Sequence, residues 1–372
     1  MKALIFMCGE GLGHTSRCLA IGKTLIDSGI KTLFCAYGYS KKHVEESGYN
    51  AIEIPSEIKL VGKAGSLDMR ESIEETLKHA DPLAYPKVMG LIKKEQPDVI
   101  LSDGYFTAAI AAEIQRKKFI FILNQTNTSN FFKNRGLDIS IIGNLATLFA
   151  DTVHKYVDRI IIPDFPPPHT ICARNAELNS EIVDKVVYSG PLVRKTFSEV
   201  READVDKPHI FCSIGGFGYR KGLLSNIIKA AKDTPKTHYT LVGGPNVNPD
   251  SFKEKIPDNV SLLGYVNNPF PYIKASDVVM ATGGHSTLME CLSFGKPVLS
   301  FPDLFHSEQQ NNAQRLEELR LGRKLSYFTP PFMITDCVEE VMGYRKNAMK
   351  RESYAKKLNG PVRVLKEINK LI

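Results

Sequence analysis

The stretch Ala281–Ala313, ATGGHSTLMECLSFGKPVLSFPDLFHSEQQNNA, decides how this chain is interpreted. It opens on a glycine loop that leads into a helical run, with small and polar residues at the junction: Gly283, Gly284, His285, Ser286 and Thr287. The unpaired N–H groups and the dipole of a helix N-terminus favour phosphate, and glycine lets a phosphate approach closely. Glu290, one turn into the helix, can accept hydrogen bonds from the hydroxyls of a ribose.

A polar cluster follows the expected strand Pro297–Phe301 in the same stretch. Glu308 and Gln309 lie in it, and carboxylate and amide groups pair well with sugar hydroxyls. Phosphate, ribose and sugar in this order make a nucleotide sugar, so we predict a donor-binding site. The alternative is an ordinary glycine-rich βα turn followed by a polar surface helix, and the Gly-Gly and Gly-Lys-Pro segments taken alone favour that alternative.

The complete order is G-G-H-S-T-x-x-E, then G-K-P, then E-Q-x-x-N-A. It resembles the donor-site signature of GT-B glycosyltransferases, among them the MurG family and the plant UDP-sugar transferases. The resemblance covers nearly the whole chain. It implies an α/β fold of two Rossmann-like, doubly wound domains facing across a cleft, with the C-terminal helix returning to the N-terminal domain. It also implies a UDP-sugar as substrate, no cofactor and no metal ion.

Length and patterning agree with two α/β domains. The chain has 372 residues, 43% of them hydrophobic, and a domain commonly holds ~150 residues. Short apolar runs alternate with longer amphipathic ones, as in a parallel sheet covered by helices. With the resemblance, we expect an acceptor-binding domain over 1–190, a linker over 191–207, a donor-binding domain over 208–345 and a returning helix over 346–372.

Strands are expected wherever short apolar runs end in polar or glycine-rich turns. In the first half they are Ala3–Met7, Lys31–Ala36, Val99–Ser102, Phe119–Leu123, Arg159–Ile162 and Lys185–Tyr188. In the second half they are His209–Ser213, Tyr239–Val242, Ser261–Leu263, Val278–Met280 and Val298–Phe301, and the chain from about Thr335 to its end is expected to be helical.

The cysteine pattern indicates the cellular compartment of the protein, and its net charge indicates which classes of partner it can bind. Seven dispersed cysteines without a C-x-x-C pair favour reduced thiols in a cytoplasmic protein. We expect neither a signal peptide nor a transmembrane span, because the apolar start is short and runs into glycines. A net charge of +7 suits an anionic membrane surface or a phosphorylated ligand. Nucleic acid is not expected, since no basic run with interleaved aromatic residues is present.

The first loop, Gly9-Glu10-Gly11-Leu12-Gly13-His14, lacks the G-x-G-x-x-G spacing of a dinucleotide site. The second strand also ends without the acidic ribose ligand, which argues against NAD. The loop resembles that of MurG-like transferases, where glycines let the acceptor approach and a histidine faces the cleft. We therefore assign Gly11, Gly13 and His14 to acceptor binding. The alternative for His14 is a helix cap or a hydrogen bond in the core.

Asp103 ends the strand that begins at Val99. The plant transferases carry an aspartate at a matching place, paired with the first-loop histidine, and the resemblance implies a catalytic pair of His14 and Asp103. A carboxylate on one imidazole nitrogen fixes the tautomer and raises the basicity of the other nitrogen. Capping of the helix expected from about Phe106 is the alternative for Asp103, and both interpretations stay open.

The remaining site residues come from the same resemblance. Gly215 and Gly216 follow Ser213 in a loop similar to the G-G-S-x-G loop of MurG-like enzymes, and we assign them to the donor phosphates. Tyr265 and Val266 correspond to the segment that lines the base pocket, although Tyr265 also suits ordinary packing. Asn124 and Asn127, beyond the strand Phe119–Leu123, complete the predicted acceptor-binding set. The D-x-D string Asp204-Val205-Asp206 lies in the charged linker and is interpreted as solvated surface.

The segment Thr128–Val157 is apolar with flanking Lys and Arg, which suits either an interfacial element on an anionic bilayer or a buried helix. The function predicted from all these features is transfer of a sugar, GlcNAc or another hexose, from a UDP-sugar to a hydroxyl of a lipid-linked or glycan acceptor at the inner face of the membrane, with inversion. One alternative is a UDP-GlcNAc 2-epimerase of the same fold. Another is a non-catalytic donor-binding subunit of a membrane transferase.

Overall fold

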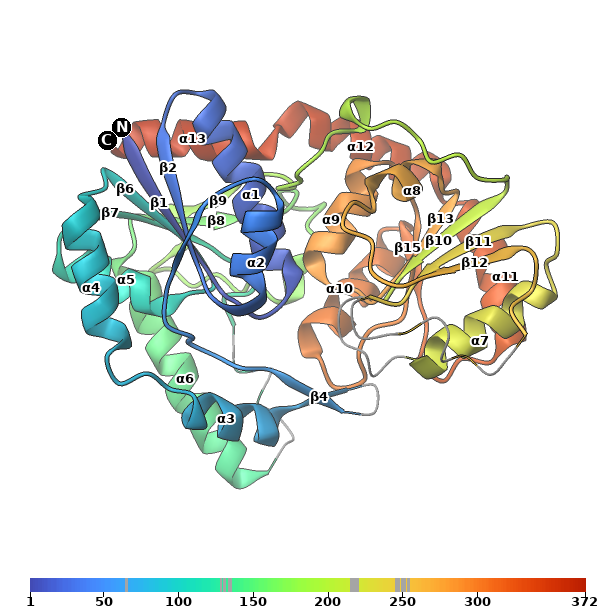
Figure 1. The fold of residues 1–372 in the computed structure, drawn as a ribbon, viewed down its shortest axis with the longest axis horizontal. Coiled ribbons are helices and arrows are strands. Elements are labelled where there is room, and N and C mark those ends of the chain that lie inside the picture. Colours follow the sequence, from blue (N-terminus) through green and yellow to red (C-terminus); the bar gives the residue numbers. More distant parts are fainter. Residues whose placement is uncertain are drawn as a thin grey trace. The chain divides into compact units, whose positions relative to one another are not determined.

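The computed structural model describes the chain except residues 64–65, 128, 130–131, 133–135, 215–220, 245–247, 249–251 and 253–254. The chain forms two compact units, each an α/β unit around a parallel sheet (Figure 1). Unit 1 comprises Met1–Val61, Asp68–Arg194 and Leu358–Ile372, and unit 2 comprises Gly62–Leu67 and Lys195–Lys357. The fold class expected from the sequence is confirmed.

Unit 1 is built on a seven-stranded sheet in the order β3-β2-β1-β6-β7-β8-β9, in which neighbouring strands run parallel. Its strands are β1 (Lys2–Met7), β2 (Lys31–Ala36), β3 (Ala51–Glu53), β6 (Val99–Asp103), β7 (Lys118–Ile122), β8 (Arg159–Ile162) and β9 (Val186–Tyr188). Its helices are α1 (Leu12–Asp27), α2 (Gly38–Glu46), α3 (Met69–Lys78), α4 (Ala84–Glu95), α5 (Phe106–Ile114), α6 (Leu137–Tyr156) and α13 (Gly360–Leu371), with short 3₁₀ turns at Cys172–Arg174 and Val183–Lys185.

The two faces of this sheet carry separate hydrophobic cores, because successive side chains of a strand point to opposite faces. Ala3 and Ile5 of β1 are buried in the core shared with α1 and α13. Leu4 and Phe6 are buried in the other core, with α4, α5 and α6. The central strands of unit 1 are therefore apolar on both faces, as expected for a parallel sheet covered by helices.

Unit 2 repeats this plan with a six-stranded sheet in the order β12-β11-β10-β13-β14-β15. Its strands are β10 (His209–Ser213), β11 (His238–Val242), β12 (Val260–Leu263), β13 (Val278–Ala281), β14 (Val298–Ser300) and β15 (Gly322–Lys324). Its helices are α7 (Lys221–Lys232), α8 (Phe270–Ala275), α9 (His285–Ser293), α10 (Ser307–Glu318), α11 (Pro331–Met342) and α12 (Arg345–Leu358), with a 3₁₀ turn at Phe197–Glu199. The strands β4 (Val61–Lys63) and β5 (Ser66–Asp68) form a separate two-stranded sheet.

The C-terminal helical segment differs in detail from its prediction. The helix expected over 346–372 is divided between α12 and α13, because Asn359 adopts a left-handed φ of 47° and interrupts the helical hydrogen bonds. Helix α13 packs into unit 1, where Val364 and Ile368 are fully buried among residues of β1 and α1. The returning helix thus completes one of the two cores of unit 1.

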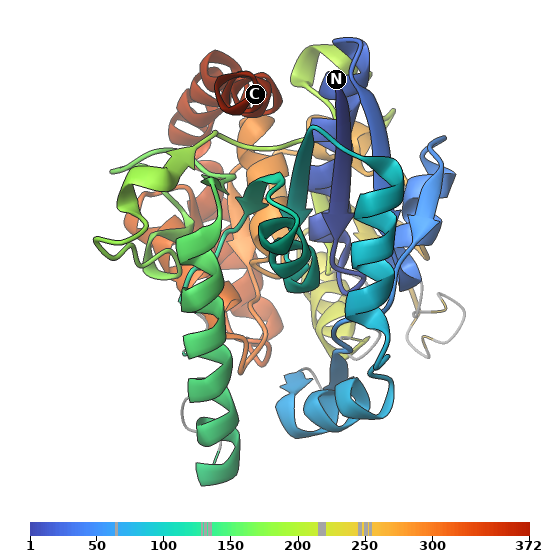
Figure 2. The same cartoon turned by 90° about the vertical axis from the view of Figure 1, so that its left-hand side faces the viewer.

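Helix α6 is the most exposed helix of unit 1 in terms of apolar side chains. Its Ile139, Ala150 and Val153 are buried, whereas Leu137 is 81% exposed and Leu145 and Leu148 are also exposed. The half of α6 that begins at Leu137 projects away from the seven-stranded sheet (Figure 2). Among the described residues, no helix combines the length and the apolar character needed to cross a membrane.

The packing of α13 can be tested by truncating Ile368. We expect Ile368→Ala to lower the free energy of unfolding of unit 1 by roughly 2–5 kcal/mol, because it removes a fully buried side chain and leaves a cavity. The matched control is Ile372→Ala in the same segment, since Ile372 is 56% exposed and exposed substitutions usually change stability by less than about 0.5 kcal/mol. Urea unfolding followed by circular dichroism measures both. Equal effects of the two variants would contradict the burial of α13.

Candidate functional site

The predicted residues of the first half lie where the strand order of unit 1 reverses. The chain passes from β1 outward to β2 and β3 and then returns to β6 on the other side of β1. Open α/β sheets bind ligands beyond the carboxyl ends of the strands at such a switch point. Met7 and Asp103, the last residues of β1 and β6, are partners in the sheet register. Because α1 begins at Leu12, His14 lies in the first turn of a helix and not in a loop.

His14 and Asp103 are in direct contact. The Nδ1 atom of His14 lies 2.6 Å from Oδ1 of Asp103. The carboxylate is 1% exposed, whereas the imidazole is 30% exposed. A contact this short between two potential acceptors requires a proton between them, so in the neutral ring Nδ1–H donates to the carboxylate. The proton-free nitrogen is then Nε2, the atom that a general base uses.

Arg17 completes this cluster, and the sequence analysis did not select it. Its Nε donates to Oδ2 of Asp103 at 2.7 Å and its Nη2 donates to Oδ1 at 2.7 Å, so the guanidinium holds both carboxylate oxygens. The Arg17 side chain is 4% exposed. Burial alone would raise the pKa of Asp103, but the charges and hydrogen bonds of Arg17 and His14 outweigh burial and hold this pKa below its usual range.

The alternative role of Asp103 as a helix cap is wrong. Helix α5 begins at Phe106, and the carboxylate of Glu57 caps it. Phe106 N donates to Oε2 of Glu57 at 2.8 Å, and Thr107 N donates to Oε1 at 2.7 Å. Burial is the main reason that the pKa of Glu57 is raised. Since the helix start is satisfied by Glu57, the carboxylate of Asp103 is left to pair with α1.

Gly104 gives His14 the space it needs. Its φ is +71°, a conformation that side-chain-bearing residues rarely adopt. A Cβ atom added there would lie 2.9 Å from Cε1 of His14 and 3.1 Å from Nδ1. The glycine after Asp103 is therefore required both by the turn of the backbone and by the imidazole.

The loop after β7 places further polar groups at the same edge of the sheet. Asn124 lies two residues beyond the end of β7, whose Ile122 is in register with Asp103. Asn127 holds its own loop: its Nδ2 donates to Oε2 of Glu177 at 2.6 Å, and its Oδ1 accepts from Ser129 N at 2.9 Å. The Asn127 side chain is therefore engaged in hydrogen bonds within the protein.

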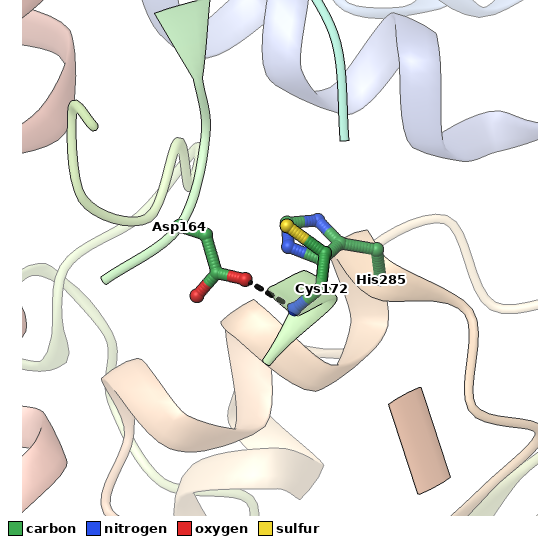
Figure 3. A group of neighbouring side chains, drawn as sticks. All are labelled: Asp164, Cys172 and His285. Atoms are coloured by element: carbon green, nitrogen blue, oxygen red, sulfur yellow. Dashed lines mark hydrogen bonds between the residues drawn. The ribbon is translucent and has the colours of Figure 1, made fainter. Parts of the chain in front are cut away.

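Asp164, which the sequence analysis did not select, organises the loop after β8. Its side chain is fully buried. Its carboxylate accepts hydrogen bonds from the backbone N–H groups of Phe165 at 2.6 Å, Ile171 at 2.9 Å and Cys172 at 2.7 Å. Figure 3 shows the carboxylate directed at the backbone nitrogen of Cys172. Three backbone donors give this carboxylate a structural role in shaping the sheet edge.

A cavity of about 680 Å³ opens in unit 1 beside the first loop. Glu10 of that loop lines it together with Tyr37 and Lys59. Burial raises the pKa of Glu10, while a backbone hydrogen bond from Leu60 and the charge of Lys59 act in the opposite direction. The lining combines such polar groups with apolar side chains, and the volume lies in the range of small-molecule sites.

In unit 2 the predicted donor loop joins β13 to α9. Gly284 is the N-cap residue of α9 and Gly283 precedes it with a φ of +86°. A Cβ atom on Gly283 would lie 2.9 Å from the carbonyl oxygen of Gln309 and 3.1 Å from Oγ of Ser300. His285 begins α9 and is buried, and Ser286 and Thr287 in its first turn are partly exposed. Glu290 is buried in the same helix.

Helix α10 is tied to this loop by side-chain amides. Asn312 is fully buried and donates from Nδ2 to the carbonyl oxygen of Gly283 at 3.1 Å. It also contacts Oε1 of Glu308 at 3.3 Å. The Oε1 atom of Gln309 accepts from Asp303 N at 3.0 Å. The polar cluster predicted to face a sugar therefore also holds its own loop, and Asn312 links it to the glycines.

The remaining predicted donor residues that the structure describes follow strand β12. Gly215 and Gly216 lie outside the described residues. Tyr265 and Val266 come directly after the end of β12 and Gly264, and Tyr265 is 38% exposed. The carbonyl oxygens of Leu263 and Gly264 accept from Gly243 N and Gly244 N, which continues the pairing of β11 and β12 to this edge. Tyr265 is thus placed at the same edge of the sheet as the β13–α9 loop.

Comparison with known proteins decides the family. A model of the glycosyltransferase family 28 C-terminal domain matches residues 224–366. An uncharacterized glycosyltransferase of Methanosarcina mazei is 49% identical over 373 residues, which cover 100% of this chain and 98% of the relative. The chain belongs to the glycosyltransferases of the GT28/GT-B type.

More distant relatives and structural neighbours of this chain are also named as glycosyltransferases. The UDP-N-acetylglucosamine–N-acetylmuramyl-(pentapeptide) pyrophosphoryl-undecaprenol N-acetylglucosamine transferase of Alkaliphilus metalliredigens is 23% identical, covering 86% of this chain and 84% of the relative. Among solved structures, the glycosyltransferase of kitacinnamycin matches with a TM-score of 0.76 at 15% identity, covering 100% of this chain and 98% of that chain. A spinosyn rhamnosyltransferase complexed with thymidine diphosphate matches with a TM-score of 0.67 at 15% identity, covering 99% and 100%. The structural matches support the GT-B fold.

The role of Gly104 beside His14 gives a test of the site geometry in this glycosyltransferase. We expect Gly104→Ala to destabilise the protein by at least roughly 1–2 kcal/mol, because alanine is strained at positive φ and its Cβ would collide with the imidazole. The control is Gly90→Ala in α4, where a Cβ meets nothing within 4 Å. That change should stabilise by about 0.5–1 kcal/mol. Chemical denaturation measures both, and a neutral Gly104→Ala would refute the packing of His14 described here.

Proposed function

We propose that this glycosyltransferase is an inverting enzyme that moves a hexose, with GlcNAc the first candidate, from a UDP-sugar to a hydroxyl of a lipid-linked or other membrane-associated acceptor. The observation that carries the proposal is the 2.6 Å contact between His14 and Asp103. Inversion by a single displacement needs a base for the attacking hydroxyl, and a neutral imidazole held by a carboxylate is suited to that task.

The proposed step is a direct displacement at the anomeric carbon of the donor. Nε2 of His14 takes the proton of the acceptor hydroxyl while that oxygen forms the new glycosidic bond. The bond from the anomeric carbon to the diphosphate breaks at the same time, and UDP leaves with the electron pair. General-base help of this kind contributes about 10²–10⁴ in rate. Asp103 keeps the proton on Nδ1, so that Nε2 is the nitrogen that reacts.

The donor is assigned to unit 2. The N-terminus of α9 and the glycines before it would receive the diphosphate, so that its charge is met by backbone N–H groups without a metal ion. Glu290 would accept the ribose hydroxyls, and Glu308 and Gln309 would contact the sugar. The base region is assigned to Tyr265 and Val266. The relative from Alkaliphilus, whose printed name specifies UDP-N-acetylglucosamine, supports uridine, whereas the solved complex with thymidine diphosphate makes dTDP the competitor to be tested.

The acceptor is assigned to unit 1, with His14, Gly11, Gly13, Asn124 and the cavity beside Glu10. A lipid-linked acceptor is supported by α6, whose exposed apolar side chains are large and lie along one face of the helix. They are Leu137, Ile141, Ile142, Leu145, Leu148 and Phe149. Such a face can lie in the headgroup region of a bilayer, and the net charge of +7 favours an anionic surface. This supports a peripheral enzyme on the cytoplasmic face of the membrane.

The same cluster disfavours one of the two alternative functions, and an incubation experiment tests the other. A subunit that only bound the donor would have no use for the buried pair of Asp103 and Arg17 under the exposed imidazole of His14. An epimerase would act on UDP-GlcNAc without an acceptor. Incubation with UDP-GlcNAc alone therefore separates the functions: conversion to the C2 epimer would establish the epimerase and contradict the transferase assignment.

The donor assignment predicts that Glu290→Gln weakens binding of UDP by about ten- to a hundredfold, since a hydrogen bond to a charged acceptor contributes roughly 1.5–3 kcal/mol. The control is Glu339→Gln, because Glu339 is an exposed residue of α11 in the same unit. Isothermal titration calorimetry with UDP, dTDP and GDP measures affinity and base preference together. If Glu290→Gln binds UDP as wild type does, the ribose assignment is wrong; if dTDP binds more tightly than UDP, the nucleotide assignment is wrong.

The membrane assignment predicts that replacing Leu145 and Leu148 together by glutamate lowers binding to phosphatidylglycerol vesicles by tenfold or more, on the order expected from ~0.8 kcal/mol per buried methylene. The control is the double replacement of Phe328 and Phe332 by glutamate, because these side chains are similarly exposed but lie in unit 2. Vesicle co-sedimentation measures both variants. Equal loss in the two, or no binding by wild type, would contradict the role of α6.

A further inference from the structure

We propose that Arg17 is a positioning residue: by holding Asp103 as a carboxylate with both oxygens engaged, it keeps His14 a neutral imidazole whose Nε2 is free to accept a proton. The inference rests on the proposed role of His14 as the base. It adds to that role a cation that compensates Asp103 without a second proton on the ring. The contacts that carry it are the two 2.7 Å hydrogen bonds from Arg17 to Asp103 and the 2.6 Å contact from Asp103 to His14.

The cluster contains a buried negative charge on Asp103. A buried carboxylate is unfavourable unless a cation compensates it. Beside an imidazole, it can obtain that cation by drawing a second proton onto the ring, which would place a hydrogen on Nε2 and remove the base. Arg17 supplies a permanent positive charge at hydrogen-bonding distance instead. The carboxylate is then neutralised without protonation of His14.

The geometry adds a second effect. Arg17 follows His14 by three residues on α1, so both side chains lie on the same face of that helix and meet Asp103 of β6. A planar guanidinium that contacts both oxygens fixes the plane of the carboxylate, which a lysine ammonium cannot do. The direction of the Nδ1–H bond, and hence the direction of Nε2, follows from that plane.

Two thiols lie beside the cluster among the residues that the structure describes. Cys18 of α1 interacts electrostatically with Asp103, and burial raises the pKa of Cys18. Cys8 follows β1 and donates its backbone N–H to the carbonyl oxygen of Asp103, and burial raises the pKa of its thiol to about 12. Both thiols are therefore neutral at physiological pH. Gly104, which also faces His14, has no side chain. Arg17 is thus the cation that compensates Asp103 in this surrounding.

The test is a titration of His14 in the full-length protein labelled with ¹⁵N-histidine. Two-bond ¹H–¹⁵N spectra distinguish the two neutral tautomers from imidazolium, and His14→Gln identifies the resonances. We expect wild type to show the Nδ1–H tautomer at pH 7. We expect Arg17→Met to take up the additional proton at a pH higher by about one to three units, because an opposite charge in contact is lost. Arg17→Lys should stay within about one unit of wild type, since it keeps the charge.

Arg70→Met is the control, because Arg70 forms an exposed ion pair with Asp138 in the same unit. It should leave the titration of His14 unchanged. A wild-type His14 with the proton on Nε2 at pH 7 would overturn the proposal without any variant. So would an Arg17→Met protein that is less stable but titrates like wild type, since that is the result of a purely structural role. If Arg17→Met does not fold, Arg17→Lys provides the test. An Arg17→Lys protein in which His14 is protonated at a pH about three units higher than in wild type would overturn the proposal, because the positive charge is still present.

The titration needs no substrate, so its outcome is independent of the donor and acceptor assignments. Loss of UDP binding together with the expected titration would refute the proposed function and leave the role of Arg17 intact. Once transfer from UDP-GlcNAc is measured, the acid limb of the pH–rate profile of Arg17→Met should move upward with the titration, so that the rate at pH 7 falls by about tenfold or more and recovers at higher pH. A uniform loss at all pH values would overturn the proposal.

Discussion

The carboxylate of Asp103 sits at the end of a central strand with almost no contact with solvent, and this position is tolerable only because a cation accompanies it. The pairing with Arg17, together with the contact from His14, joins the end of β6 to α1 through polar side chains. It also determines what the neighbouring helix start can do, since α5 must find its cap elsewhere and takes it from Glu57. Gly104 then follows, because the chain has to turn away beneath an imidazole. Three local features of unit 1 thus depend on one buried charge.

Strand ends were the part of the site that the sequence could predict. His14 and Asp103 were recognisable because each follows a strand-like apolar run, and parallel strands bring their carboxyl ends to one edge. Arg17 was not, because an arginine in an amphipathic helix is usually solvated and nothing local marks it as buried. Its spacing of three residues from His14 was the available signal. Glu57 lies 49 residues before Phe106, and such a distant cap leaves no pattern in the sequence.

Unit 2 illustrates a different limit. The glycines and the polar cluster were correctly located around a βα junction, but their side chains have contacts that residue type alone does not reveal. Gln309 supports the backbone of Asp303, and Asn312 supports that of Gly283. The short edge strands β3 and β15 also escaped prediction, because their residues, Ala-Ile-Glu and Gly-Arg-Lys, do not form an apolar run. The longer strands and the two-unit α/β architecture followed directly from apolar periodicity.

The return of α13 to unit 1 has a consequence for biosynthesis. Val364 and Ile368 belong to the core that covers one face of the first sheet, yet they are translated after the whole of unit 2. While the chain is still on the ribosome, α1 covers only part of that face of unit 1, and the rest is an exposed apolar surface of the kind that invites aggregation. Unit 2 has its own helices in sequence and can close before synthesis ends. The domain that is made first is therefore completed last, and any premature stop after unit 2 would release a chain with an open core in the half that carries His14.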